Sequence, residues 1–363
     1  MPGANKLIAS ANDPKIRAVF VVPVFDDWPS LTMLLTKLDE LLDGHNVVVS
    51  VVAVNDAPAT ESVPGFDGEF LWRSIESVEV LHLTRNLGHQ RAIAVGLSYV
   101  QARYEGDCVI VADADGEDQP TDMMRLIESY QRNPNAITVA ERSKRTESLV
   151  FRIGYRIYKE LFRFLTGRSV SFGNFCIIPW RRLINIVSMS EAWNNFPASL
   201  IQSRLPLVRM PTVRGTRYFG KSRMSLVSLV VHGVGSIAVF SDTVLIRTVI
   251  ISILLFIGTM FAVAGVIFLK IIGHATPGWA SNLAMSLTIF AIQAIMLSLI
   301  AAFLVLNNRT ASTIIPRFAY RRFLAGSEKF SQAVVEPTIN QPQRVQVGKA
   351  YAAASGRVRM HGT

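Results

Sequence analysis

Short apolar runs alternate with amphipathic segments along the first half of the chain. The runs are rich in β-branched residues and end in polar clusters, which predicts buried strands. Leucines at helical spacing predict a helix over residues 28–42, and a second helix is predicted over 91–103. Alternating strands and helices predict a mostly parallel α/β sheet that carries its site along one edge. The predicted strands cover residues 18–25, 47–54, 78–83, 109–112 and 136–140.

Polar clusters follow four successive predicted strands. Capping of a helix explains any one of them, because Asp and Asn are good N-caps, but it is a weaker explanation for all four. Asp113 and Asp115 stand two apart, and both ionise at low cost only when a cation or donor lies between them. Carboxylate oxygens are ligands that Mg²⁺ or Mn²⁺ prefers, so this edge is a candidate metal site. The clusters are Asp26-Asp27, Asn55-Asp56, Arg85-Asn86 with His89, and Asp113-Ala114-Asp115.

The apolar surplus lies in the C-terminal third. Residues 248–269 and 280–306 carry no charge, and each run is long enough to cross a hydrocarbon core of roughly 30 Å. The tail from residue 307 carries a net positive charge, whereas the turn between the runs has only Lys270 and His274. Positive flanks stay inside, so we expect a two-helix hairpin with both termini in the cytoplasm. The run at 18–25 is too short for a signal sequence, so no export signal is expected.

Composition narrows the class of protein and its compartment. The chain has 363 residues, is 50% hydrophobic and has 37 Lys/Arg against 27 Asp/Glu, a net charge of +10. A basic tail beside a membrane anchor is more simply attracted to anionic headgroups, so no nucleic-acid partner is expected. Cys108 and Cys176 give neither a metal-binding spacing nor a disulfide framework, which agrees with a reducing compartment.

Four motifs give the chain a specific resemblance. In order, they read VVPVFDD, VNDAP, LTRNLGHQRAIAVGL and DADGEDQP. Over residues 17–240 the chain resembles family 2 glycosyltransferases of GT-A fold, of the polyprenyl-phosphate type that includes dolichyl-phosphate mannose synthase and bactoprenol glucosyltransferase. The resemblance implies a Rossmann-like GT-A catalytic domain over 17–225, a juxtamembrane helix over 226–244 and a transmembrane hairpin over 245–306. Residues 1–16 are expected to be disordered and 307–363 to form a basic cytoplasmic tail, of which 318–330 lie on the membrane.

The same resemblance implies the reaction and its partners. A nucleotide-sugar would donate one sugar to polyprenyl phosphate at the cytoplasmic face of the inner membrane, and the multi-pass protein could form a tetramer, as relatives do. Asp113, Asp115 and Glu117 would bind Mg²⁺ or Mn²⁺, although the family commonly has Gln at the position of Glu117. The nucleotide-sugar would contact Pro23, Phe25, Asp27, Asp56, Asn86, His89, Asp113, Ala114 and Asp115. Gln90 could also hydrogen-bond the sugar or a phosphate.

The acceptor side begins after the strand at 136–140. Residues 147–168 place apolar residues on one stripe and basic residues on other faces, which predicts a helix in the headgroup layer, with a core-packing helix as the alternative. By resemblance, Arg142, Arg145 and Arg152 would hold the lipid phosphate, and Arg142 would also be catalytic. The segment RYFGKSRMSL resembles a family loop whose Arg217, Lys221 and Ser222 offer donors to phosphate.

Two positions depart from the family pattern. Asn174 stands where many relatives have an Asp that is often proposed as a base, and Asn55 stands where many have another Asp. A phosphate monoester is largely dianionic at pH 7, since its second pKa is about 6, so it needs no base. The substitution at Asn174 therefore favours a lipid-phosphate acceptor. The alternatives are transfer to a saccharide or lipid hydroxyl, and an inactive membrane scaffold that binds nucleotide-sugar or lipid.

Overall fold

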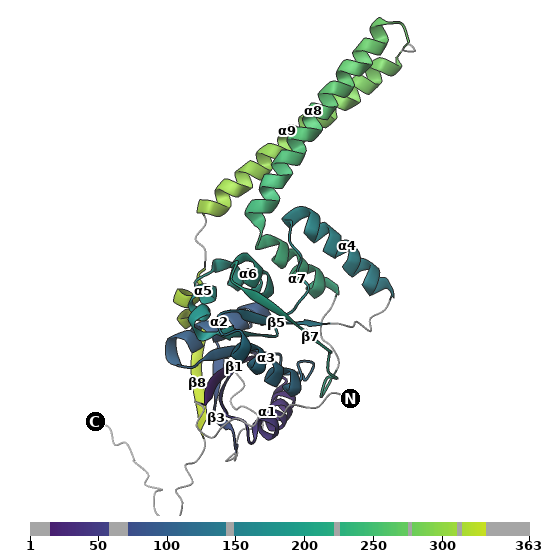
Figure 1. The fold of residues 1–363 in the computed structure, drawn as a ribbon. Helices are drawn as coiled ribbons and strands as arrows, with labels where there is room; N and C mark the ends of the chain where they lie inside the picture. The colour runs from purple at the N-terminus through teal and green to yellow at the C-terminus, as the bar shows by residue number, and fades with distance from the viewer. Residues whose placement is uncertain are drawn as a thin grey trace, which may run out of the picture. The chain divides into compact units, whose positions relative to one another are not determined.

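One eight-stranded sheet organises the chain outside its two long C-terminal helices (Figure 1). The computed structural model describes residues 15–57, 72–142, 149–220, 226–274, 278–310 and 314–331. The strands are β1 Ile16–Val24, β2 Val47–Asn55, β3 Ile75–Leu83, β4 Cys108–Val111, β5 Ile137–Arg142, β6 Cys176–Pro179, β7 Leu207–Thr212 and β8 Leu324–Ser331. Their order in the sheet is β7-β5-β6-β4-β1-β2-β3-β8.

The first four strands form the parallel half that the sequence predicts. β1 pairs in parallel with β2 and β4, and β2 pairs in parallel with β3. Alternate residues of β1 enter two cores: Phe20 packs in the core of α1 (Trp28–Leu42), and Val21 packs in the core of α2 (His89–Arg103). At Gly96 of α2, a Cβ would lie 2.7 Å from Val21, so only glycine lets this helix approach the sheet so closely. The carboxyl ends of these strands therefore meet at one edge.

The other half of the sheet is mixed. β6 runs antiparallel to both β4 and β5, whereas β5 and β7 are parallel. The sequence analysis assigned no strand to residues 176–179 or 207–212, because runs this short carry little periodicity. Four further helical segments lie along this part of the chain: α3 Pro120–Arg132, α5 Trp180–Val187, η1 Ser190–Trp193 and α6 Phe196–Gln202. β6 continues from a loop that contains Asn174 and so brings that loop beside the parallel half.

The amphipathic helix expected over residues 147–168 is present as α4, Leu149–Thr166. Phe162 lies on its buried face, is 2% exposed and packs in a small hydrophobic cluster with Val239 and Phe240. The Tyr158 hydroxyl bonds Ser236 Oγ of α7 (Leu226–Ala238) at 2.9 Å. α4 packs against its neighbours through these two side chains, and its exposed side chains are described with the site below.

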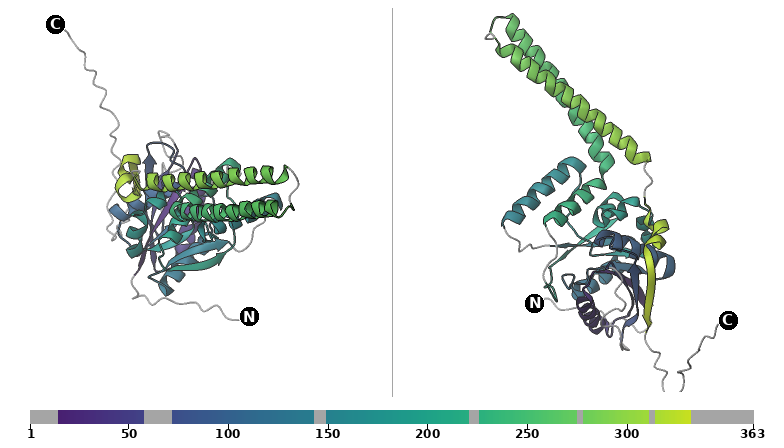
Figure 2. Two further views of the ribbon diagram at one scale, coloured as in Figure 1. Left: turned by 90° about the horizontal axis from the view of Figure 1, so that it is seen from above. Right: turned by 180° about the vertical axis from the view of Figure 1, so that it is seen from behind.

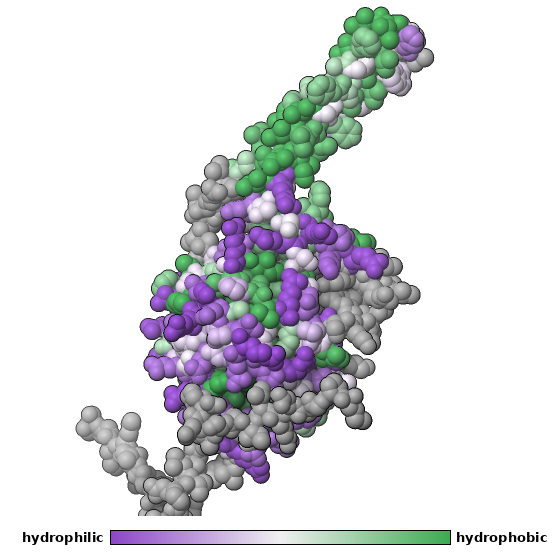
Figure 3. Space-filling model, in the orientation of Figure 1, coloured by the Kyte–Doolittle hydropathy of each residue, from purple (hydrophilic) through white to green (hydrophobic). Residues whose placement is uncertain are grey.

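Two long apolar helices form a hairpin, α8 Ser241–Ile271 and α9 Trp279–Thr310. Figure 2 shows them side by side in both views, and Figure 3 shows their largely hydrophobic surface. Both helices are long and apolar enough to cross a membrane, as the uncharged runs predict. Side chains along them are mostly exposed within the chain, which suits contact with lipid.

The segment after the hairpin corrects one expectation. α10 Pro316–Ala319 and η2 Tyr320–Phe323 lead into β8, which pairs antiparallel with β3 at the edge of the sheet. Residues 324–331 therefore form an edge strand of the sheet, whereas the sequence predicted a membrane-lying segment over 318–330. Their sequence, LAGSEKFS, is polar and lacks a repeating apolar pattern because an edge strand is only partly covered. The expected disorder of residues 1–16 extends to Ile16, which the structure places in β1, while residues 1–14 and 332–363 fall outside the described residues.

Candidate functional site

A compact acidic loop follows β4. The four strand residues are buried, and the loop then runs from Asp113 to Gln119 before Pro120 opens α3. Asp115 Oδ1 accepts the Glu117 N–H at 2.9 Å, and Asp118 Oδ2 accepts the Asp113 N–H at 3.0 Å. Gly116 has a φ of 86°, a left-handed conformation that favours glycine. The loop is thus closed by its own carboxylates, which fixes where the acids lie.

Arginines from a distant segment bind two of these acids. Arg217 Nη2 lies 2.6 Å from Asp115 Oδ2. Arg214 donates from Nε to Glu117 Oε2 at 2.8 Å and from Nη2 to Oε1 at 2.6 Å, a bidentate pair. The sequence analysis proposed Arg217 as a phosphate ligand but gave no role to Arg214. No local pattern reveals these contacts, since they join residues about a hundred positions apart.

Arg142 reaches the same cluster from the end of β5. Its Nη2 lies 3.6 Å from both Glu117 Oε2 and Asp118 Oδ1. Asp118 is almost fully buried, and burial together with the charge of Asp113 raises its pKa to about 8 despite the nearby guanidinium. Burial and the Asp113 charge also raise the pKa of Asp115. Burial and the charge of Asp113 thus disfavour the ionised forms of Asp115 and Asp118, and a bound cation would favour those forms.

His89 opens α2 and faces the first acid of the loop. Its Nε2 lies 3.1 Å from Asp113 Oδ1. Burial lowers the pKa of His89, but the charge and hydrogen bond of Asp113 outweigh burial, so the pKa is raised overall. Burial likewise raises the pKa of Asp113, but the charge of His89 outweighs that effect and holds it below its ordinary value. The two groups thus stabilise each other as an ion pair.

Asn174 meets His89 through a chain of hydrogen bonds. The Phe196 N–H donates to Gln90 Oε1 at 2.8 Å, which turns Gln90 Nε2 towards Asn174 Oδ1 at 3.0 Å. Asn174 Nδ2 then lies 2.9 Å from His89 Nε2, and this contact is a hydrogen bond only when that nitrogen carries no proton. This contact requires a lone pair on Nε2, whereas the contact with Asp113 requires a proton there. Asn174 therefore opposes the protonation of His89 that Asp113 favours.

Asp56 fixes the turn that precedes α2. Its carboxylate is 4% exposed and accepts the Leu87 N–H at 2.7 Å and the Gly88 N–H at 2.9 Å. These bonds hold the turn that leads into α2, and burial raises the pKa of Asp56 in spite of them. Asn55 accepts the Ala57 N–H at 3.1 Å. The predicted contact of Asp56 with a nucleotide remains a prediction.

The remaining predicted site residues differ in where the structure places them. Phe25 and Asp27 follow β1 at the same edge, where Phe25 is 41% exposed. Pro23 and Ala114 are buried, and Asn86 is exposed in the turn before α2. Arg145, Lys221 and Ser222 lie outside the described residues, as does the side chain of Arg152. Their roles as ligands of phosphate stay predictions.

The donor set for a divalent metal is only partly assembled. Asp113 Oδ1 is buried and, apart from His89 Nε2, has no hydrogen-bond partner among the described residues. Asp115 and Glu117 are engaged by arginines, and no three acidic, histidine or cysteine side chains in the described ranges gather closely enough to hold a metal. Asp113 therefore suits a hard cation, and Asp115 could join it once Arg217 moves. Further oxygens would have to come from a bound ligand.

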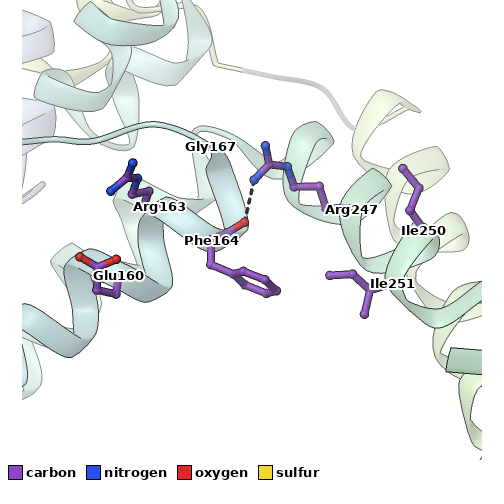
Figure 4. A pocket seen from close by; sticks show the side chains of 7 residues that line it. All are labelled: Glu160, Arg163, Phe164, Gly167, Arg247, Ile250 and Ile251. Atoms are coloured by element: carbon purple, nitrogen blue, oxygen red, sulfur yellow. Dashed lines mark hydrogen bonds between the residues drawn. The ribbon is translucent and has the colours of Figure 1, made fainter. Parts of the chain in front are cut away.

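A groove of about 610 Å³ lies between α4 and α8, and none of its lining residues belongs to the acidic loop. Arg247 of α8 donates from Nη1 to the Phe164 carbonyl at 2.6 Å, near the end of α4 (Figure 4). A guanidinium is favourable there, since the last carbonyls of a helix carry partial negative charge. The lining combines charged and apolar side chains: Glu160, Arg163, Phe164, Gly167, Arg247, Ile250 and Ile251. The groove suits an amphiphile better than a soluble ligand.

Comparisons with known proteins identify a glycosyltransferase domain. Residues 19–191 match the profile of glycosyl transferase family 2. The chain is 22% identical over 295 residues to an uncharacterised glycosyltransferase of Synechocystis sp., covering 80% of this chain and 90% of the relative. It is 26% identical over 267 residues to the undecaprenyl-phosphate 4-deoxy-4-formamido-L-arabinose transferase of Edwardsiella ictaluri, covering 72% and 79%.

The similarity to solved structures is more distant. Glucosyl-3-phosphoglycerate synthase of Mycobacterium tuberculosis, with Mn²⁺, UDP-glucose and phosphoglyceric acid, gives a TM-score of 0.43 at 14% identity, over 63% of this chain and 80% of that one. Mannosyl-3-phosphoglycerate synthase of Rubrobacter xylanophilus gives 0.44 at 12% identity, over 62% and 73%. The assignment therefore comes from the sequence profile and the relatives: residues 19–191 form a glycosyl transferase family 2 domain, and the chain is a glycosyltransferase.

Proposed function

We propose that this glycosyltransferase moves one sugar from a nucleotide-sugar to polyprenyl phosphate at the cytoplasmic face of the inner membrane, with inversion at the anomeric carbon. The observation that carries the proposal is the joining of an acid and arginine cluster with a hairpin apolar enough to span a membrane. Relatives named as undecaprenyl-phosphate sugar transferases support this acceptor. A UDP- or GDP-sugar supplies the donor in this scheme.

The donor side depends on neutralising a leaving diphosphate. Asp113 and Asp115 would hold Mg²⁺ or Mn²⁺, and the ion would stabilise the negative charge that builds on the diphosphate. Arg217, released from Asp115, would donate to the phosphate oxygens and keep the donor in place. His89 would hold the Asp113 carboxylate in its ionised form, since the two contact each other at 3.1 Å.

The acceptor side needs little proton transfer. A phosphate monoester has a second pKa of about 6 and is already a nucleophile at pH 7. Asn174 cannot act as a base, because its side chain is an amide. A phosphate acceptor has no proton that must be removed before it attacks, so Asn174 is compatible with an acceptor of this kind. Arg142, 3.6 Å from the nearest carboxylates, is placed to attract the lipid phosphate towards the cluster. These residues orient the phosphate for attack at the anomeric carbon.

The lipid would approach along α4. Ile157, Leu161 and Phe164 are 63%, 48% and 64% exposed, an apolar face suited to the headgroup layer. The groove beside it combines Arg163 and Arg247 with apolar residues, and would accommodate part of the prenyl chain near a charged head. Both termini would lie in the cytoplasm, since the hairpin turn carries little positive charge.

The test uses the full-length protein in nanodiscs. Radiolabelled nucleotide-sugars, first screened by their effect on the melting temperature with Mn²⁺ present, are offered with purified polyprenyl phosphate. We expect label in the organic phase, lost when a chelator is added. Label on a saccharide or lipid hydroxyl would replace the proposed acceptor. Binding of nucleotide-sugar without turnover on any acceptor would instead support a scaffold.

A further inference from the structure

Residues 213–220 lie across the acidic loop and are fastened to its backbone. The Gly215 N–H donates to the Glu117 carbonyl, and the Tyr218 N–H donates to the Asp115 carbonyl, both at 2.9 Å. Gln119 Nε2 adds a bond to the Val213 carbonyl at 3.3 Å. These bonds bring the segment into register with the loop, although neither forms regular secondary structure.

Two glycines make this contact close. A Cβ at Gly215 would lie 2.5 Å from the Gly116 carbonyl, and a Cβ at Gly116 would lie 2.6 Å from the Tyr218 ring. Lys37 Nζ of α1 also lies over this ring, 4.3 Å from its centre, in a cation–π contact. The segment therefore has one well-fitting position over the loop.

A bidentate ion pair between Glu117 and Arg214 stabilises that position. Both carboxylate oxygens accept from the single guanidinium, and the Glu117 side chain is only 11% exposed. A glutamine could offer one oxygen and would turn an NH₂ group towards the guanidinium, so it could not form this fork. The Glu that replaces the family's usual Gln is thus matched by an arginine of the same chain.

We propose that Glu117 and Arg214 are a positioning pair that holds residues 213–220 across the acidic loop and so delivers Arg217 to the diphosphate site. Arg217 follows Arg214 by three residues and already contacts Asp115 at 2.6 Å. Under this proposal Glu117 gives its charge to Arg214 and is not a metal ligand, which revises the role that the family resemblance implies for it. What Arg217 meets there rests on the proposed function.

The experiment compares Glu117→Gln, Arg214→Gln and the double variant with wild type, using the full chain in detergent. Glu128→Gln is the matched control, since Glu128 pairs with Arg132 on the exposed face of α3 at 3.2 Å. Mn²⁺ affinity is measured without donor by electron paramagnetic resonance. Trypsin cleavage after Arg217 is followed by mass spectrometry, and KM for the nucleotide-sugar is measured where turnover is found.

A positioning pair predicts one pattern of results. Both single variants leave the dissociation constant for Mn²⁺ within about twofold, speed the cleavage after Arg217, and raise KM for the donor by about tenfold, as for coupled contacts. The double variant is no worse than either single variant, since each single change already breaks the pair. The Glu128→Gln control matches wild type in all three measurements.

Other results would overturn the proposal. A loss of Mn²⁺ affinity of more than about tenfold in Glu117→Gln, with Arg214→Gln unaffected, would make Glu117 a metal ligand. Unchanged cleavage after Arg217 in both variants would show that the pair does not hold the segment. Mn²⁺ binding and cleavage need no donor or acceptor, so they test the pair even if the proposed reaction fails.

Discussion

The acidic loop and the outer face of α4 differ in whether their side chains find partners within the chain. In the loop, the carboxylates of Asp115 and Glu117 find arginines within the chain, and only Asp113 Oδ1 keeps a buried oxygen with no partner besides His89. On α4, large apolar side chains stay exposed, and no described element covers them. Most carboxylates of the loop thus have cationic partners within the chain, and the Asp113 oxygen suits a cation. The exposed apolar side chains of α4, in contrast, would be covered only by an apolar surface outside the chain. The proposed sugar transfer and the proposed membrane contact thus depend on different residues, so single substitutions should impair one without the other.

The largest expected effect comes from a substitution in the acidic loop. Asp115→Asn removes a charge from the proposed metal site and the ion pair with Arg217, so transfer should fall by at least about a hundredfold, as when a group that stabilises transition-state charge is lost. Initial rates at saturating Mn²⁺ measure this effect. Glu128→Gln, which changes an exposed carboxylate of α3 that pairs with Arg132, should keep its rate. An active Asp115→Asn would rule out the assigned role.

The next effect concerns the inner face of α4. Phe162 is 2% exposed and meets Phe240 edge-on with ring centres 5.8 Å apart. Phe162→Ala should leave a cavity and destabilise the chain by about 3 kcal/mol. The melting temperature in detergent should fall clearly. An unchanged melting temperature would mean that α4 is not fixed to its neighbours through this face.

A smaller effect is expected two residues further along the helix. Phe164 is 64% exposed, so Phe164→Ala should leave the melting temperature in detergent unchanged. Burial of a phenylalanine in lipid contributes about 1.5–3 kcal/mol, so KM for a membrane-presented acceptor should rise by about tenfold. KM for the nucleotide-sugar should not change. A fall in melting temperature equal to that of Phe162→Ala would erase the distinction between the two faces.

The two regions also differ in how far the sequence predicts them. Alternating strands and helices give the parallel half of the sheet, and two uncharged runs give the hairpin, because these patterns are local and long. β6 and β8 escape prediction: one has four residues and the other is a polar edge strand. The sequence likewise predicts that acids gather after β4, but not that arginines bind them.

Those arginine contacts depend on tertiary structure. Arg214 meets Glu117, and Asn174 meets His89, only because β6 and β7 bring distant loops beside the parallel half. Sequence reasoning could place each residue near the edge of the sheet but could not pair them. The clearest local signal is Glu117 itself, a charged residue at a position where the family resemblance implies a neutral glutamine, because this extra charge favours a cation nearby.

The smallest effect is a pH dependence of stability that comes from the loop. The pKa of Asp118 is raised from 3.8 to about 8 by burial and by Asp113, so between these values the folded chain holds a proton that the unfolded chain has lost. Stability should therefore fall as pH rises from 6 to 8, by about 1 kcal/mol per pH unit. His89, with its pKa also raised, acts in the same direction, whereas Asp113, with its pKa lowered, titrates below this range.

Melting temperatures from pH 6 to 8 in buffer with a chelator measure this trend, because a bound metal would favour ionised acids and reverse it. Asp118→Asn removes one titrating group and should flatten the curve, while Phe164→Ala on α4 should leave its slope unchanged. A wild-type melting temperature that rises with pH would mean that the arginines already neutralise the loop fully. The loop would then have no charge left for a cation to balance, and the contrast with the uncovered face of α4 would disappear.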